Sequence, residues 1–219
     1  MTVPSNEQRL TPRQQERRRR ILDVARKLTA EQGYEAVSMR TIAAKSGVAE
    51  KTLYNIFVTK DRLIATAAQE RALGVLEMAL ERSPEGGWAT LFAFAACVDE
   101  STQDAPTMAR VLAPVLLDHP DLVGLEEVYE HRLSDTIAQL AAAGSISCPS
   151  PRLQARLLRI AIVAAVLFWA RYELRDEELG PYLELCVGQL FLPIAHGDHA
   201  TMLAARIAVA RTRLESLSN

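Results

Sequence analysis

The sequence has few aromatic residues and few residues that interrupt helices. Phe, Trp and Tyr make up 5% of the 219 residues and Gly and Pro number ten each, whereas hydrophobic residues as a whole reach 49%. An apolar fraction supplied mainly by Ala and Leu, with little Gly or Pro to break it, is typical of helical proteins. We therefore expect an all-α fold.

Cysteine and long apolar runs are also scarce. Cys97, Cys148 and Cys186 are widely spaced and form no Cys-x-x-Cys pair, so neither a disulfide framework nor a zinc ribbon is indicated. The longest wholly apolar run, residues 160–170, has 11 residues, against the roughly 20 that a membrane-spanning helix needs. The N-terminus has no secretory hydrophobic region. We expect a cytoplasmic protein with no membrane partner.

Charge is distributed unevenly along the chain. Residues 1–60 hold 12 Lys and Arg against 6 Asp and Glu, whereas residues 61–219 hold 13 against 21, although the net charge of the whole is only −2. A basic head on an acidic body suggests a polyanion as the partner of the head.

Helix signals begin after a polar arm, residues 1–10, that we expect to be flexible. Thr11, Pro12 and Gln14 match a capping box with proline at the first helical position. Apolar positions then recur with helical spacing up to Gly33, which can end the helix in a left-handed cap. The expected inward face consists of Ile21, Leu22, Ala25, Leu28 and Thr29.

Two short helices follow. Ser38 can cap the first, Gly47 makes a tight turn, and the second runs over about residues 49–56. This arrangement is the sequence signature of a helix-turn-helix. Further helices are expected over residues 60–82, 88–102, 106–118, 121–143, 151–174, 177–195 and 198–217, separated by Gly, Pro and Ser signals.

The segment GVAEKTLYNIFVTKDRL, residues 47–63, has the pattern of a helix that reads DNA. Leu53 and Phe57 are four residues apart and can hold it to its domain, which leaves a polar face outward. Tyr54 has a hydroxyl that can reach a phosphate. The other polar side chains on this segment are Lys51, Thr52, Asn55 and Lys60.

This segment resembles the recognition segment of the TetR family of bacterial transcriptional regulators, whose pattern is G-V-x-x-x-T-[LI]-Y-x-x-F-x-x-K-[ED]-x-L. The resemblance extends over residues 14–63. It implies a DNA-binding domain over residues 11–60 and an effector-binding and dimerisation domain over residues 61–219. The segment departs from the commonest pattern at Ala49, Asn55 and Ile56, which leaves the operator sequence open.

The resemblance also implies residue roles. Thr52 and Tyr54 would contact phosphates of double-stranded DNA, and Lys60 would clamp the backbone. Gly47 would make the turn. The base-facing positions would be Glu50, Lys51 and Asn55, and the flanking phosphates would meet Ser38 and Arg40. An ordinary helical hairpin with a solvated polar face is the alternative for this segment, and Arg17–Arg20 can equally be a solvated face or phosphate contacts.

Later helices are candidates for a homodimer interface. Residues 151–174 are apolar almost all round, so they must be buried on more than one side. The resemblance implies a two-fold dimer formed by C-terminal helices. The candidate interface residues are Leu158, Ile162, Leu183, Val187, Leu190, Phe191, Ile207 and Leu214; for any of them, plain intrachain core is the alternative.

Aromatic and other large apolar side chains of the body gather on a few helices and could line a cavity for a mainly apolar small-molecule effector. They are Trp88, Phe92, Met108, Leu112, Leu116, Tyr129, Phe168, Trp169 and Tyr172, each of which could instead be core. The His196–His199 stretch, HGDH, is better explained by a helix junction than by a metal site. No catalytic grouping and no cofactor site is indicated.

The sequence therefore predicts a DNA-binding repressor that binds a near-palindromic operator as a dimer under the control of an effector. A regulator without small-molecule sensing is one alternative. A helical enzyme with an incidental basic head is the other.

Overall fold

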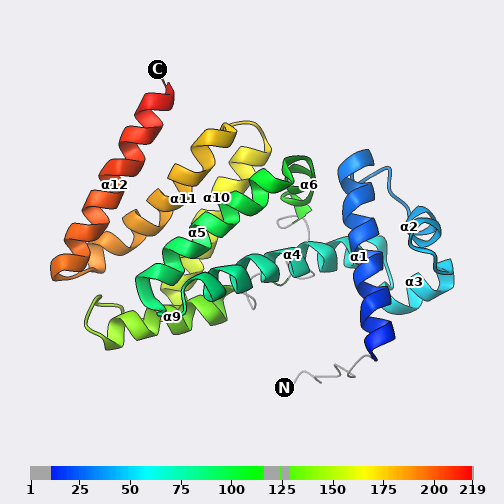
Figure 1. The fold of residues 1–219 in the computed structure, drawn as a ribbon, viewed down its shortest axis with the longest axis horizontal. Coiled ribbons are helices and arrows are strands. Elements are labelled where there is room, and N and C mark those ends of the chain that lie inside the picture. The colour runs from blue at the N-terminus through cyan, green and yellow to red at the C-terminus, as the bar shows by residue number, and fades with distance from the viewer. Residues whose placement is uncertain (1–10, 116–123, 125–128, 219) are drawn as a thin grey trace.

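The computed structural model describes residues 11–115, 124 and 129–218. Within these ranges all regular elements are helical, and one isolated β-bridge joins Ile146 to Ala195. The expected all-α fold is confirmed. Figure 1 shows the long helix α1 and two short helices, α2 and α3, at one end of an elongated molecule and a helical body at the other, with α4 running between them. The domain boundary at residue 60 stays a prediction, because α4 packs on both parts.

The N-terminal part consists of α1 (Pro12–Gln32), α2 (Met39–Ser46) and α3 (Glu50–Phe57). The capping box is confirmed: the backbone N–H of Thr11 donates to Gln14 Oε1 at 2.8 Å, and the Thr11 hydroxyl accepts from the Gln14 backbone N–H. Gly33 ends α1 as expected but at φ 81° and ψ 160°, so the prediction of a left-handed cap is wrong. The pattern identified where glycine is needed, not which positive-φ region it adopts.

A small core holds the three helices together. The expected inward face of α1 is buried throughout, and Leu53 and Phe57 fix α3 to it. Gly47 takes the left-handed conformation, φ 66° and ψ 38°, that the tight turn between α2 and α3 requires. Two short helices on the floor of α1 thus form the expected helix-turn-helix.

The rest of the chain forms the body. Its described elements are α4 (Lys60–Arg82), α5 (Gly87–Asp104), α6 (Pro106–Leu112), α9 (His131–Ala142), α10 (Pro151–Ala170), α11 (Asp176–Phe191), the 3-10 turn η2 (Leu192–Ile194) and α12 (Gly197–Ser218).

Three of these helices end earlier than the sequence predicts. The described part of α6 stops at Leu112, and residues 116–118 of the expected helix lie outside the described residues, as do 121–123 and 125–128 of the next one. In α10 the chain turns after Ala170, and Tyr172 adopts a positive φ of 63°. In α11 the α-helix stops before Pro193, which has no N–H to continue the backbone ladder.

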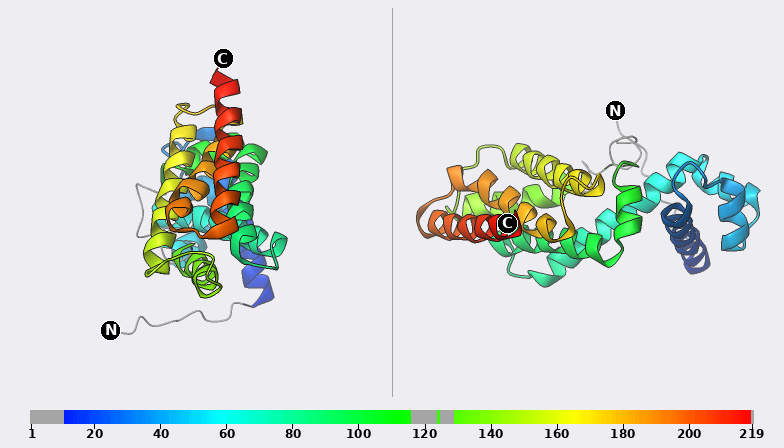
Figure 2. Two further views of the ribbon diagram at one scale, coloured as in Figure 1. Left: turned by 90° about the vertical axis from the view of Figure 1, so that its left-hand side faces the viewer. Right: turned by 90° about the horizontal axis from the view of Figure 1, so that it is seen from above.

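The helices of the body are joined by contacts that run from α4, next to the helix-turn-helix, to α12 at the far end. α5 contacts α4, α9 and α11, while α10 contacts α9 and α11. α12 lies on α11, at the end of the molecule far from the helix-turn-helix (Figure 2). Gly188 permits this close packing, since a Cβ there would lie 2.6 Å from Ile207 Cγ1. α6 contacts both α1 and α10, so it is a second bridge between the two parts.

Among the described helices, α10 is long and apolar enough to cross a membrane when judged by length and composition only. The uninterrupted apolar run of 11 residues therefore gave too low a measure of how long and apolar this helix is. In its most apolar stretch of 18 residues, 44% is buried within the chain. The core helix of a soluble protein meets the same length and composition criteria. Since α10 packs between α9 and α11, its place is in the body.

Candidate functional site

The outward face of α3 collects the side chains predicted to meet DNA. Glu50, Lys51 and Asn55 are exposed, and Tyr54 is 46% exposed. Thr52 is half-buried beside them. Glu50 lies in the first turn, where the helix dipole favours an acid, but Ala49 offers no side-chain cap. The face therefore combines one anion, one cation and neutral hydrogen-bonding groups, which suits contact with base edges.

The start of α2 presents a second polar edge. Ser38 caps α2 by accepting a hydrogen bond from the Thr41 backbone N–H at 3.1 Å, and Arg40 is exposed in the first turn. A helix N-terminus beside an exposed guanidinium is suited to a phosphate. The contact of either residue with DNA stays a prediction.

Two of the four consecutive arginines of α1 are structural. Arg18 lies over the Phe57 ring, 5.2 Å from its centroid, and pairs with Glu70 at 3.5 Å. Arg20 donates from Nε to the Ser46 carbonyl oxygen at 3.1 Å. These contacts fasten α1 to α2, α3 and α4.

Lys60 is engaged by the protein itself. Its ammonium donates to the Tyr34 carbonyl oxygen at 3.0 Å and lies 4.3 Å from the centroid of the Tyr34 ring. The Tyr34 hydroxyl in turn hydrogen-bonds the Asp61 carboxylate. Lys60 therefore fixes the loop after α1 to the start of α4, a role that the sequence did not indicate.

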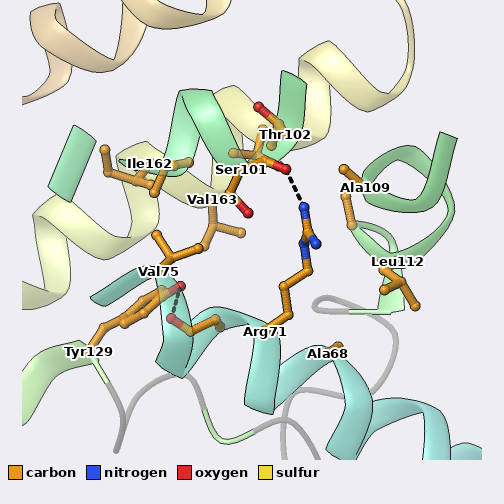
Figure 3. A pocket seen from close by; sticks show the side chains of 14 residues that line it. Ala68, Arg71, Val75, Ser101, Thr102, Ala109, Leu112, Tyr129, Ile162 and Val163 are labelled. Atoms are coloured by element: carbon orange, nitrogen blue, oxygen red, sulfur yellow. Dashed lines mark hydrogen bonds between the residues drawn. The ribbon is translucent and has the colours of Figure 1, made fainter. Parts of the chain in front are cut away.

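The body contains an apolar cavity of about 90 Å³ (Figure 3). It lies between α4, α5, α6 and α10, with Tyr129 closing one side. The Tyr129 hydroxyl donates to the Ala72 carbonyl oxygen at 3.2 Å, and burial raises the pKa of this phenol, so it stays neutral. The lining residues are Ala68, Arg71, Ala72, Val75, Val98, Ser101, Thr102, Ala109, Leu112, Ala113, Tyr129, Ile162, Val163 and Val166.

Of the nine residues predicted to bind the effector, Leu112 and Tyr129 line this cavity, and Leu116 lies outside the described residues. The other six are elsewhere. Trp88 packs on Phe191, the Phe92 ring lies under the Arg206 guanidinium, and Trp169 is buried in the core. Phe168 and Tyr172 are on the surface, 51% and 79% exposed. Met108 borders a groove between α1 and α6.

Most of the predicted aromatic residues lie away from the cavity because large aromatic side chains fill the space between helices. A cavity forms instead where small residues face one another. Four alanines, four valines and one isoleucine line this one. Facing alanines on successive turns were the signal available in the sequence. Ile162, predicted to be at the dimer interface, is among the lining residues.

The residues predicted for the dimer interface face the core of the same chain. Leu158, Ile162, Leu183, Val187, Phe191 and Ile207 are buried, while Leu190 and Leu214 are half-buried. A side chain with almost no exposed surface is core of its own chain, which is the alternative for the six buried positions, whereas a place for Leu190 and Leu214 in an interface stays a prediction. On α10 the exposed apolar residues are instead Leu153, Leu157, Ile160 and Phe168.

The HGDH stretch is a helix junction, as the sequence suggested. Gly197 begins α12, His196 Nε2 hydrogen-bonds Ser147 Oγ at 2.6 Å, and the His199 ring lies beside Trp88. Within the described part of the chain no three His, Cys, Asp or Glu side chains group as metal ligands.

Known proteins resemble this chain in the same N-terminal region. The family model described as "Bacterial regulatory proteins, tetR family" matches residues 21–67, from within α1 into α4. The HTH-type transcriptional repressor KstR of Rhodococcus jostii is 48% identical over 54 residues, which are 25% of this chain and 26% of that relative. The match thus spans about a quarter of the curated relative's length.

Solved structures share the fold beyond this segment. FadR of Thermus thermophilus, a TetR-family repressor in complex with lauroyl-CoA, superposes with a TM-score of 0.64 at 19% identity, over 79% of this chain and 92% of that one. The fatty acid degradation regulator FadR from Bacillus halodurans gives 0.65 at 18%, over 78% and 95%. At such low identity these likenesses concern the fold.

The helix-turn-helix at one end and the cavity-bearing helical body at the other define a two-part, all-helical regulatory protein. Its DNA-binding segment, residues 21–67, matches the family model of the TetR bacterial regulatory proteins, and its described fold is that of solved TetR-family structures. The model describes regulatory proteins, which favours the regulator over the enzyme alternative.

Proposed function

We propose that the protein is a transcriptional repressor that binds a near-palindromic operator as a homodimer and is controlled by a mainly apolar small molecule. The observation that carries the regulatory part is the cavity, because α4 lines it and also packs on α1. The exposed face of α3 and the exposed N-terminus of α2 support DNA binding. The repressor name of the KstR relatives and of Thermus thermophilus FadR supports the direction of control.

Dimerisation is supported by a stripe along α10. Leu153, Leu157, Ile160 and Phe168 recur at helical spacing on the side opposite the core, and each is at least 41% exposed. An apolar stripe along a whole helix is stable in water when a second helix covers it. A two-fold axis through this stripe would bring α10 of one chain against α10 of its partner and would place two α3 helices on one DNA face.

Control by a ligand follows from how the helices connect. α4 and α6 both line the cavity and both contact α1. A ligand that fits one arrangement of these helices better than another shifts the equilibrium between dimer states with different α3 spacing. Typical coupling of this kind is about 1–3 kcal/mol, or roughly 5- to 150-fold in affinity.

The test starts by selecting bound fragments from a pool of random DNA, which identifies the operator sequence. Operator affinity is then measured with and without apolar ligands, in the unmodified protein and in Leu112→Trp. We expect the substitution to fill the cavity and abolish the ligand response. Leu73→Trp is the matched control, because Leu73 lies on α4 but is exposed and outside the cavity.

A regulator without small-molecule sensing is the remaining alternative. It would be supported if no apolar ligand changed operator affinity and Leu112→Trp behaved as Leu73→Trp does. The absence of any selected DNA sequence would contradict the function as a whole.

A further inference from the structure

The cavity contains one charged group. Arg71 projects from α4 among alanine and valine side chains, and in Figure 3 its guanidinium lies between Ser101 of α5 and the α6 residues Ala109 and Leu112. The guanidinium donates a hydrogen bond to the Ser101 carbonyl oxygen. Since a guanidinium has five N–H donors, this bond leaves most of its capacity unused.

Two of the nearby carboxylates are engaged elsewhere. Glu70 pairs with Arg18 at 3.5 Å, and Asp23 pairs with Arg26. Among the described residues no carboxylate lies within 4.0 Å of the Arg71 nitrogens, the usual limit for an ion pair. Burial and then the nearby Arg26 guanidinium lower the pKa of Arg71, and together they outweigh the opposite, smaller effect of the Asp104 carboxylate, so the surroundings on balance disfavour its charge. An anion placed beside Arg71 would offset both costs.

Arg71 also reaches the outside of the body. Together with Arg19, Arg26 and Ser101 it lines an open groove between α1, α4 and α5, which shares Arg71, Val75 and Ser101 with the lining of the cavity. Three arginines line the groove, two of them from α1, together with the carboxylates Asp23 and Glu70, each of which pairs with an arginine other than Arg71. An apolar chain in the cavity would have its polar end at Arg71, facing this groove.

We propose that Arg71 binds the anionic group of an amphiphilic effector whose apolar part fills the cavity. A carboxylate fits best, because it can accept two parallel hydrogen bonds from one guanidinium. The proposal rests on the effector control proposed above. It adds the chemical class of the ligand, because an apolar lining without Arg71 would not distinguish an anionic ligand from a neutral one. Ligand pockets commonly combine an apolar lining with a few polar groups that set orientation.

The test compares octanoate with n-octanol, which have the same chain length and differ in charge. Calorimetric titration of the full-length protein should show octanoate binding at least about tenfold more tightly. Arg71→Met keeps an apolar stem and removes the charge, so it should abolish this preference and leave octanol binding unchanged. Arg82→Met is the matched control on the same helix, since Arg82 is exposed and pairs with Glu100 outside the cavity.

Three results would overturn the proposal: octanoate that does not bind, octanoate that binds no better than octanol, or an equal loss of both ligands in Arg71→Met. The octanoate and octanol comparison needs no variant, so a lack of preference for octanoate overturns the proposal even if Arg71→Met does not fold. Operator affinity measured with each ligand separates the two hypotheses. If octanoate binds through Arg71 but operator affinity does not change, effector control is rejected and the anion site is kept. If octanoate and octanol change operator affinity equally, the anion site is rejected and effector control is kept.

Discussion

The guanidinium of Arg110 lies over the indole ring of Trp169, with Cζ 3.9 Å from the ring centroid. The same side chain donates to the Trp169 carbonyl oxygen and pairs with Asp176, whose carboxylate also accepts from Trp169 Nε1 at 2.8 Å. The centroid of the Tyr172 ring also lies close to this guanidinium, 4.1 Å from Cζ. One arginine therefore fastens α6, which touches α1, to the junction of α10 and α11.

Removing this arginine should destabilise the body. We expect Arg110→Ala to lower the free energy of unfolding by about 1–3 kcal/mol, because the charge-assisted bonds and the stacking are lost together. Urea denaturation measures the change. Arg206→Ala is the control, since Arg206 also lies over a ring, that of Phe92 at 4.0 Å, but is 46% exposed and should matter less. Equal effects of the two substitutions would contradict a special role for Arg110.

Substitutions on α3 should separate the residues that contact DNA phosphates from those that recognise the base sequence. Tyr54→Phe removes a hydroxyl suited to a phosphate and should weaken binding to all DNA sequences alike. Lys51→Ala and Asn55→Ala should change the preference among sequences, with about 1–3 kcal/mol of discrimination per base contact. Fluorescence anisotropy on the selected operator and on point variants of it measures both. If all three proteins lose affinity equally on every sequence, the assignment of α3 is incorrect.

Lys60 needs a separate measurement, because its ammonium holds the Tyr34 loop. We expect Lys60→Ala to lower the thermal midpoint as well as DNA affinity. A loss of DNA affinity with an unchanged midpoint would instead favour a purely phosphate-binding role.

The α10 stripe should control the oligomeric state. Ile160 is 51% exposed, and a charge there would have to be buried if the stripe forms the dimer interface. We expect Ile160→Glu to produce a monomer in sedimentation velocity and to weaken operator binding. Val209→Glu, at a 58% exposed position on α12, should stay dimeric. The operator half-sites should lie one helical turn, about 34–36 Å, or somewhat more apart. An unmodified protein that is monomeric at micromolar concentration would refute the interface.

The joint between α3 and α4 holds a strained residue. Val58 has φ 66° and ψ −49°, and the Thr59 N–H bonds the Phe57 carbonyl oxygen at 2.7 Å, which makes a positive-φ γ-turn. Because such strain costs about 1–3 kcal/mol and a glycine loses about 0.5–1 kcal/mol more on folding, Val58→Gly should stabilise the protein by about 1 kcal/mol. Thermal unfolding measures the change.

Val209→Gly is the matched control for this substitution. Val209 is as exposed as Val58, 58% against 59%, but it lies inside α12, where glycine should destabilise. A destabilised Val58→Gly protein would show that the turn stores no strain.

The sequence by itself determined the helix-turn-helix. Capping at Thr11 and Ser38, the turn at Gly47 and the anchors Leu53 and Phe57 are local features, and the structure places each of them as expected. They are readable because a helix start, a tight turn and a four-residue spacing depend on residues close together in the chain.

Only the tertiary structure decided which face of each body helix points where. α10 is apolar almost all round, so its periodicity could not separate the buried Leu158 from the exposed Ile160. The cavity was likewise hidden, because it lies where small side chains of α4, α6 and α10 fail to fill the space between helices far apart in the sequence. Arg71 shows the same limit: a charged residue on a long helix predicts a solvated position, and only the packing of α5 and α6 around α4 places its guanidinium beside an apolar cavity.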